Sequence, residues 1–177
     1  VMALTYYLAK DDIAARALDD QLDSLSAVMP QGLYDNDLVQ DAIVMQNAHG
    51  KNITVYRAFK NNQLTGAAFE TSSIGYAGEI KLMLGVDANG KILGTRVVAH
   101  KETPGLGDKI EVRKGDWILG FTGLGFGNPP VEKWKVKKDG GQFDQFTGAT
   151  ITPRAVLKAI REGLEFFDAH KAQMEVH

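Results

Sequence analysis

The sequence predicts an α+β fold, in which antiparallel β-strands lie between a helix near the start of the chain and a helix near its end. Two observations predict it. Hydrophobic residues recur at helical spacing over residues 8–28 and again beyond residue 152, whereas residues 42–99 show short runs with the period of two that is typical of half-buried strands. The glycine-rich stretch beyond residue 100 predicts long loops, and we expect the functional site there.

The first helix is predicted over residues 8–28. Ala14, Leu18, Leu22 and Leu25 fall on one helical face, acidic residues lie between them, and Pro30 ends the pattern. The chain opens on the largely apolar residues 1–8, which suggests that a membrane segment or signal has been removed before them.

The central strands are predicted from alternation and from turn residues. The clearest hairpin has a turn at Asn89 and Gly90, because Asn-Gly between two alternating runs is a strong hairpin signal. This favours antiparallel pairing over a parallel βαβ sheet. The expected strands cover residues 42–45, 53–59, 64–69, 80–86 and 92–99.

Beyond the loops, one more strand and the final helix are expected. Residues 133–138 read as a strand with Trp134 and Val136 on one face. The final helix carries a hydrophobic stripe at helical spacing, and we interpret this stripe as core. It consists of Val156, Ala159, Ile160, Leu164 and Phe167.

Composition excludes several classes of function. The chain has 177 residues, a formal net charge of −2 and no cysteine, so it has no disulfide, thiol nucleophile, thiolate zinc site or iron–sulfur cluster. The mixed charge argues against a nucleic-acid partner. The four histidines lack metal-ligand spacing, and we predict no metal. The sequence also lacks a P-loop, a dinucleotide-binding fingerprint and a nucleophile elbow.

The mouth of the final helix is the first candidate site. Thr147 and Thr150 flank a Gly-Ala pair there, and the first turn carries Arg154 but no acid. A helix start exposes N–H groups and the positive end of the dipole, which suits an anion. The alternative is an ordinary helix start, with Thr152 as the N-cap and Pro153 as the first helical residue.

The second candidate is the loop that follows the strand at residues 92–99. Pro104 and Gly105 suit the central positions of a type II turn, Leu106 is an apolar tip, and Gly107 adds exposed N–H groups. Such a loop can face a flat aromatic ligand whose anionic end lies at the helix mouth. A plain exit from the strand is the alternative reading.

Two segments together resemble a known family. Residues 100–109 (HKETPGLGDK) and 144–152 (DQFTGATIT) resemble the periplasmic FMN-binding domain, and within that family the G subunit of the Rnf-type (Rsx) ion-translocating electron transport complex. The resemblance covers most of the chain, from the first helix to the last.

The resemblance implies a covalently bound cofactor. In this family the last Thr of the motif carries FMN through a phosphoester, which places the FMN on Thr150. A flavin transferase would move FMN from FAD to that hydroxyl and would recognise the motif residues Asp144, Thr147, Gly148 and Ala149. The flavin ring would lie against the loop formed by Glu102, Thr103, Pro104, Gly105, Leu106 and Gly107. A phosphoester at this place gains stabilisation from the helix dipole and N–H groups.

The resemblance also implies a role and a location. The protein would be a redox-active electron carrier subunit, not an independent enzyme, with the other subunits of the complex and the flavin transferase as partners. One N-terminal helix would anchor it in the bacterial inner membrane, with the domain on the periplasmic side. Residues 1–30 would form the helix that follows the removed anchor, and residues 31–177 the FMN-binding domain.

Two other hypotheses stay open. The equivalent FMN subunit of the Na⁺-translocating NADH:quinone reductase shares both motifs. A flavin-free interaction or assembly module is the alternative from a different class, because a domain can keep its motifs and lose its cofactor.

Overall fold

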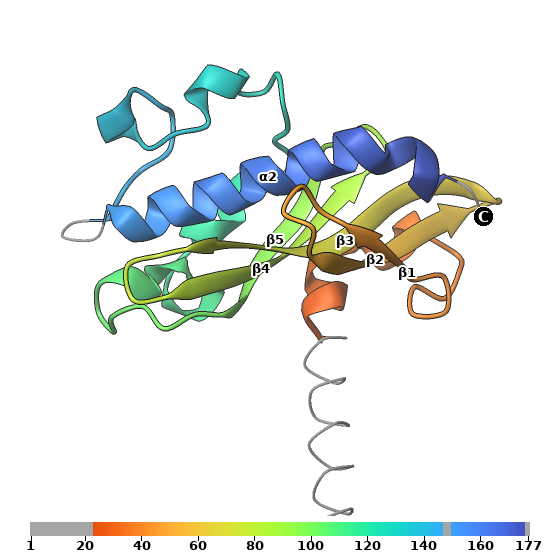
Figure 1. Ribbon diagram of the computed structural model, residues 1–177, viewed down its shortest axis with the longest axis horizontal. Helices are drawn as coiled ribbons and strands as arrows, with labels where there is room; N and C mark the ends of the chain where they lie inside the picture. Colours follow the sequence, from red (N-terminus) through yellow and green to blue (C-terminus); the bar gives the residue numbers. More distant parts are fainter. Residues whose placement is uncertain (1–22, 147–149, 176–177) are drawn as a thin grey trace, which may run out of the picture.

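The computed structural model describes residues 23–146 and 150–175 and contains one antiparallel sheet crossed by a long helix (Figure 1). Each strand pairs with the next one in the chain, so the sheet is a meander in the order β1 to β5. The predicted α+β class is therefore confirmed. The elements are β1 (Ile43–Gln46), β2 (Asn52–Lys60), β3 (Gln63–Ile74), β4 (Glu79–Asp87), β5 (Ile92–Ala99) and α2 (Ile151–Met174).

The β4–β5 hairpin forms where the Asn-Gly signal predicts it. The Asp87 carboxylate accepts hydrogen bonds from the N–H groups of Asn89 and Lys91, and Gly90 has a φ of 83°. β3 continues to Ile74, beyond the predicted end at residue 69, and pairs there with β4 alone. Residues 71–73 are Thr-Ser-Ser, so the hydrophobic pattern ended before the strand did.

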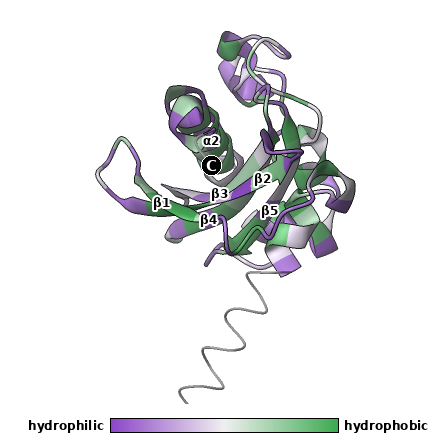
Figure 2. Cartoon of the chain, turned by 90° about the vertical axis from the view of Figure 1, so that its right-hand side faces the viewer, coloured by the Kyte–Doolittle hydropathy of each residue, from purple (hydrophilic) through white to green (hydrophobic). Residues whose placement is uncertain are grey.

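Helix α2 packs across one face of the sheet (Figure 2). The predicted hydrophobic stripe of α2 is buried, which confirms its role as core. Gly163 lets the helix approach closely, because a Cβ there would lie 2.7 Å from Cδ2 of Leu84. The hydroxyl of Thr71 on β3 donates to the carbonyl of Ala159 at 2.8 Å and fixes the helix against the sheet.

The other face of the sheet is covered by the segment that begins the described part of the chain. Residues 23–28 are helical, and Leu25, Val28 and Met29 pack against side chains of β2, β3 and β4. Gly85 and Gly94 face this segment, and a Cβ on Gly85 would lie 2.2 Å from the carbonyl oxygen of Val28. The remainder of the predicted first helix, residues 8–22, lies outside the described residues.

Among the residues that the structure describes, none of the helices combines the length and the apolar character that crossing a membrane requires.

The region between β5 and α2 is built from short 3-10 turns. The predicted strand at residues 133–138 is wrong, because this segment carries 3-10 turns at both ends and only an isolated bridge between Val136 and Phe143. Trp134 and Val136 are nevertheless buried, and the indole N–H of Trp134 donates to the carbonyl of Pro129. The turns are η2 (Gly107–Ile110), η3 (Val112–Lys114), η4 (Trp117–Phe121), η5 (Val131–Lys133) and η6 (Lys137–Asp139), and η1 (Gln31–Leu33) precedes the sheet.

Candidate functional site

Thr150 lies at the N-cap of α2 and is half-buried. Its carbonyl accepts the N–H of Arg154, but within the described residues its hydroxyl makes no capping hydrogen bond. The alternative in which Thr152 caps the helix is wrong, because α2 begins at Ile151. The start of α2 thus has a threonine hydroxyl that the helix does not use. Thr147, Gly148 and Ala149 lie outside the described residues.

The charge of Arg154 is balanced by an acid from a different segment. Its Nε and Nη2 donate to the two carboxylate oxygens of Asp139 at 2.7 Å each. The hydrogen bonds from this guanidinium lower the pKa of Asp139 below its usual value. The first turn of α2 itself contains no acidic residue, so the positive end of its dipole is not balanced from within the helix.

The loop after β5 forms the turn that its sequence predicts. The N–H of Leu106 donates to the carbonyl of Thr103 at 3.1 Å, Pro104 occupies the second position, and Gly105 has a φ of 82°, as a type II turn requires. The Asp108 carboxylate accepts the N–H of Gly105 at 2.9 Å and so braces the turn. The side chain of Leu106 is 43% exposed, so the apolar tip faces outward.

The carboxylate of Glu102 joins this loop to two other segments. It is only 4% exposed, and it accepts the hydroxyl of Thr152 on α2 at 2.7 Å. It also accepts the N–H groups of Tyr76 and Ala77, in the turn between β3 and β4, at 2.8 and 2.7 Å. Burial opposes ionisation, but these three hydrogen bonds together with His100 outweigh it and lower the pKa of Glu102. We call this meeting point of the three segments the Glu102 junction.

Two glycines make the Glu102 junction compact. A Cβ on Gly107 would lie 2.8 Å from both Cβ of Glu102 and the hydroxyl of Thr152, and a Cβ on Gly75 would lie 2.4 Å from the Glu102 carboxylate. The β3–β4 turn was not predicted from the sequence as part of the site. Gly75 and Gly78 flank two residues, and this pattern predicts a turn but does not predict which residue the turn contacts.

Each segment of the junction also exposes an apolar side chain. Tyr76 and Ile74 do so at the β3–β4 turn, Leu106 in the loop and Ile151 at the start of α2. Exposed apolar groups beside a helix start suit a ligand with an aromatic body and an anionic end. The exposed apolar side chains and the helix start therefore fit the two ends of a flavin with its phosphate.

The segment that precedes the Thr147–Thr150 motif is fixed by contacts with Trp117. The carbonyl of Asp144 accepts the indole N–H of Trp117 at 2.9 Å, and the ring of Phe146 packs edge-on against Trp117. The carboxylate of Asp144 is 70% exposed and forms an ion pair with Lys137 at 2.6 Å. Asp144 thus presents its side chain to solvent while its backbone is fixed.

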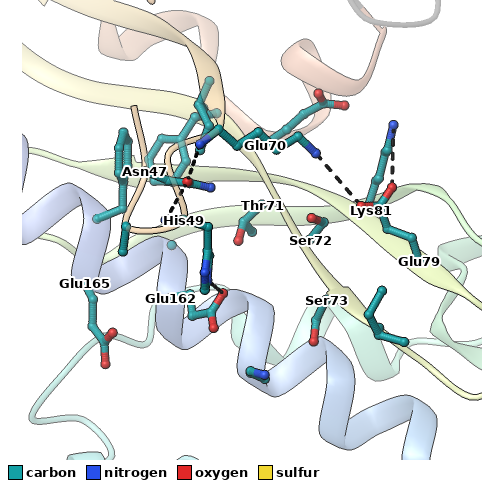
Figure 3. Close-up of a pocket in the computed structure, with 18 of the residues that line it drawn as sticks. Asn47, His49, Glu70, Thr71, Ser72, Ser73, Glu79, Lys81, Glu162 and Glu165 are labelled. Carbon is teal, nitrogen blue, oxygen red and sulfur yellow. Dashed lines mark hydrogen bonds and ion pairs between the residues drawn. The ribbon is translucent and has the colours of Figure 1, made fainter. Parts of the chain in front are cut away.

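A cleft of about 1050 Å³ runs along α2 and reaches its first turn (Figure 3). Its walls are α2, the polar half of β3 and the turn between β1 and β2, and it includes Ile151 and Arg154. His49 on that turn faces Glu162 of α2, with 3.6 Å between Nε2 and the carboxylate. None of residues 102–107 lines this cleft, so it adjoins the candidate site at the start of α2 and at Ile74, beside the β3–β4 turn, but not at the loop.

Comparison with known proteins gives consistent matches. The family described as FMN-binding domain matches residues 75–165, which include the β3–β4 turn, the 102–107 loop and the start of α2. The chain is 48% identical to the G subunit of the ion-translocating oxidoreductase complex of Cereibacter sphaeroides, across 98% of this chain and 81% of that protein. It is 53% identical to the protein of the same name from Stutzerimonas stutzeri, across 83% of this chain and 64% of the relative.

Solved structures show the same fold at lower identity. NqrC from Shewanella oneidensis superposes with a TM-score of 0.56 at 22% identity, covering 81% of this chain and 76% of NqrC. This likeness concerns the fold alone.

Proposed function

Since the chain belongs to the FMN-binding domain family and, within it, to the G subunits of ion-translocating oxidoreductase complexes, we propose that it is an electron carrier subunit of a membrane-bound complex of this type. FMN is its cofactor and the other subunits are its partners. When bound, FMN supplies the electron-transfer chemistry, and the protein sets its position and electrostatic surroundings.

The attachment point in this proposal is Thr150, through a phosphoester. The single observation that supports it is a half-buried threonine at the start of a 24-residue helix, whose hydroxyl the helix does not use as a cap. In the attachment step the Oγ–phosphorus bond forms, the pyrophosphate bond of FAD breaks, and AMP leaves while the hydroxyl proton is released. The helix N-terminus favours the phosphate charge that remains.

The surrounding residues divide into two groups in this proposal. Asp144 is accessible to a flavin transferase, and Thr147, Gly148 and Ala149 complete the motif that the enzyme recognises. The loop from Glu102 to Gly107, with Thr103, Pro104, Gly105 and Leu106 between them, forms one wall beside the flavin, and its exposed Leu106 contributes apolar contact.

The location belongs to the proposal too. An N-terminal helix anchors the protein in the bacterial inner membrane, and the FMN-binding domain of residues 31–177 lies on the periplasmic side, with residues 1–30 as the segment that follows the anchor. The matches at 48% and 53% sequence identity favour the G-subunit role over that of the related quinone reductase subunit, because the chain shares only 22% sequence identity with NqrC.

Mass spectrometry of the denatured protein tests the proposal. Protein made together with the flavin transferase should gain the mass of one FMN minus water, located at Thr150 within the tryptic peptide 139–154. Thr150→Ala should abolish the gain. Thr122→Ala is the matched control, because Thr122 is an exposed threonine outside both motifs, and it should keep the FMN. An unmodified wild-type peptide would refute the carrier proposal and leave the flavin-free module, while modification at Thr147 or Thr152 would refute the attachment site.

A further inference from the structure

We propose that Glu102 is a positioning residue: its carboxylate holds the β3–β4 turn and the 102–107 loop against the first turn of α2, and thereby presents Thr150 for cofactor attachment. The second half of this statement rests on the proposed function. The first half concerns the protein alone.

The Glu102 carboxylate is buried, and both of its oxygens accept hydrogen bonds from other segments of the protein. One oxygen accepts the hydroxyl of Thr152 and the N–H of Tyr76, and the other accepts the N–H of Ala77. The side chain is almost fully buried, so it acts on a ligand through the segments that it holds. A carboxylate suits this place because each of its oxygens is only an acceptor, and all three partners are donors.

The backbone of Glu102 is held by a hydrogen bond as well. Its N–H donates to Nδ1 of His100 at 3.0 Å, which leaves the His100 proton on Nε2, directed at the Glu111 carboxylate 2.7 Å away. The side chain therefore starts from a fixed position and reaches two segments that are 25 to 50 residues distant in the chain. The side chain thus connects elements that are distant from one another in the sequence.

One of the three segments joined by Glu102 is the start of α2, which carries Thr150. Thr152 lies two residues after Thr150, so the bond to Glu102 fixes the rotation and height of the first turn of α2. Because the hydroxyl of Thr150 makes no capping bond among the described residues, its placement depends on the backbone on either side. Loss of the Glu102 bonds would free that backbone while the core of α2 stays packed.

Glu102→Gln tests the role of the carboxylate with the smallest change in shape. The amide keeps the shape of the side chain, but its NH₂ group cannot accept, so one of the three donors faces another donor. Glu132→Gln is the matched control, since it makes the same change at an exposed residue of η5 that is not bonded to the Glu102 junction. Ile160→Val, in the buried face of α2, controls for a general loss of stability.

The positioning itself is measured by amide hydrogen exchange on the folded full chain. In Glu102→Gln, exchange should rise about tenfold or more at Tyr76, Ala77 and Arg154, because hydrogen bonds to a charged group are among the strong ones. Exchange in the β4–β5 hairpin should not change. Unchanged exchange at Arg154 would show that α2 is held without Glu102 and would overturn the proposal.

Attachment is measured separately, with purified flavin transferase and FAD, at a temperature where every variant is folded. The kcat/KM for transfer to Glu102→Gln should fall about tenfold or more, while Glu132→Gln and Ile160→Val match the wild type. Equal transfer rates for Glu102→Gln and the wild type would refute the link to Thr150. If the wild type itself gains no FMN on Thr150, the proposed function fails, and the exchange experiment still decides the positioning role.

Discussion

Thr152→Val removes one hydrogen bond from the Glu102 junction and changes little else. Thr152 is 1% exposed, and its hydroxyl donates to the Glu102 carboxylate at 2.7 Å. Valine has nearly the same shape and a similar helix propensity, so the helix keeps its packing.

The size of the effect follows from the charge of the acceptor. A hydrogen bond to a charged group contributes about 1.5–3 kcal/mol, and its loss leaves a buried carboxylate with two donors instead of three. We therefore expect the free energy of unfolding to fall by about 2 kcal/mol. For a chain of this length that corresponds to a melting temperature lower by about 4–8 °C.

Urea unfolding followed by circular dichroism measures this change, with an unchanged m-value as the sign that the folded state is intact. Thr71→Val is the matched control, because its hydroxyl donates at 2.8 Å to the neutral carbonyl of Ala159. It should cost about 1 kcal/mol. If Thr152→Val costs no more than Thr71→Val, the carboxylate of Glu102 is not the strong acceptor that we describe.

Three further predictions concern the hydroxyl of Thr150, the ionisation of Glu102 and the close approach at Gly85. Thr150→Ala should change the free energy of unfolding by less than about 0.5 kcal/mol in urea titrations, because the hydroxyl caps nothing, whereas loss of a working cap would cost about 1 kcal/mol. The folded pKa of Glu102 is lowered from 4.5, so its contribution to stability is present above pH 4.5 and is lost as the pH falls through the folded value; below pH 4.5 the urea midpoint of the wild type should therefore fall more steeply than that of Glu102→Gln. Gly85→Ala should cost about 1–3 kcal/mol in thermal unfolding, because its Cβ meets the backbone of Val28, while Gly32→Ala, with open space around it, should be nearly neutral; equal costs would contradict the close approach of the two segments.

The sheet and α2 were predictable because their signals are local. Alternation over β4 and β5 with Asn89 and Gly90 between them specifies a hairpin without reference to the remainder of the chain. The same alternation misled at residues 133–138. Trp134 and Val136 alternate into the core, but the chain returns at once, and Gly141 lies so close to the backbone of Lys135 that a strand has no room to continue. Burial with a period of two is a property of extended chain, with or without a neighbouring strand.

The site was predictable only in part, for a similar reason. Pro104 and Gly105 specify their own turn, so the type II geometry could be read from the residues. The helix start was misassigned, because Thr-Pro is a common start signal and the true start depends on what Thr152 contacts. The bonds from Glu102 to Tyr76 and Ala77 join residues 26 and 25 positions apart, and no local pattern contains them.

The order of elements along the chain has a consequence for folding. In a meander each strand pairs with its neighbour in sequence, so the contacts of the sheet are short-range, and such contacts form quickly. Helix α2 follows the whole sheet, and its bond from Ala159 to Thr71 spans 88 residues. We expect its docking to be the slow, late step, since closing a long loop costs entropy before any contact forms. In the proposed function, a flavin transferase that requires the start of α2 to be docked at the Glu102 junction would then modify folded molecules and not nascent ones, so that attached FMN would identify a chain whose folding is complete.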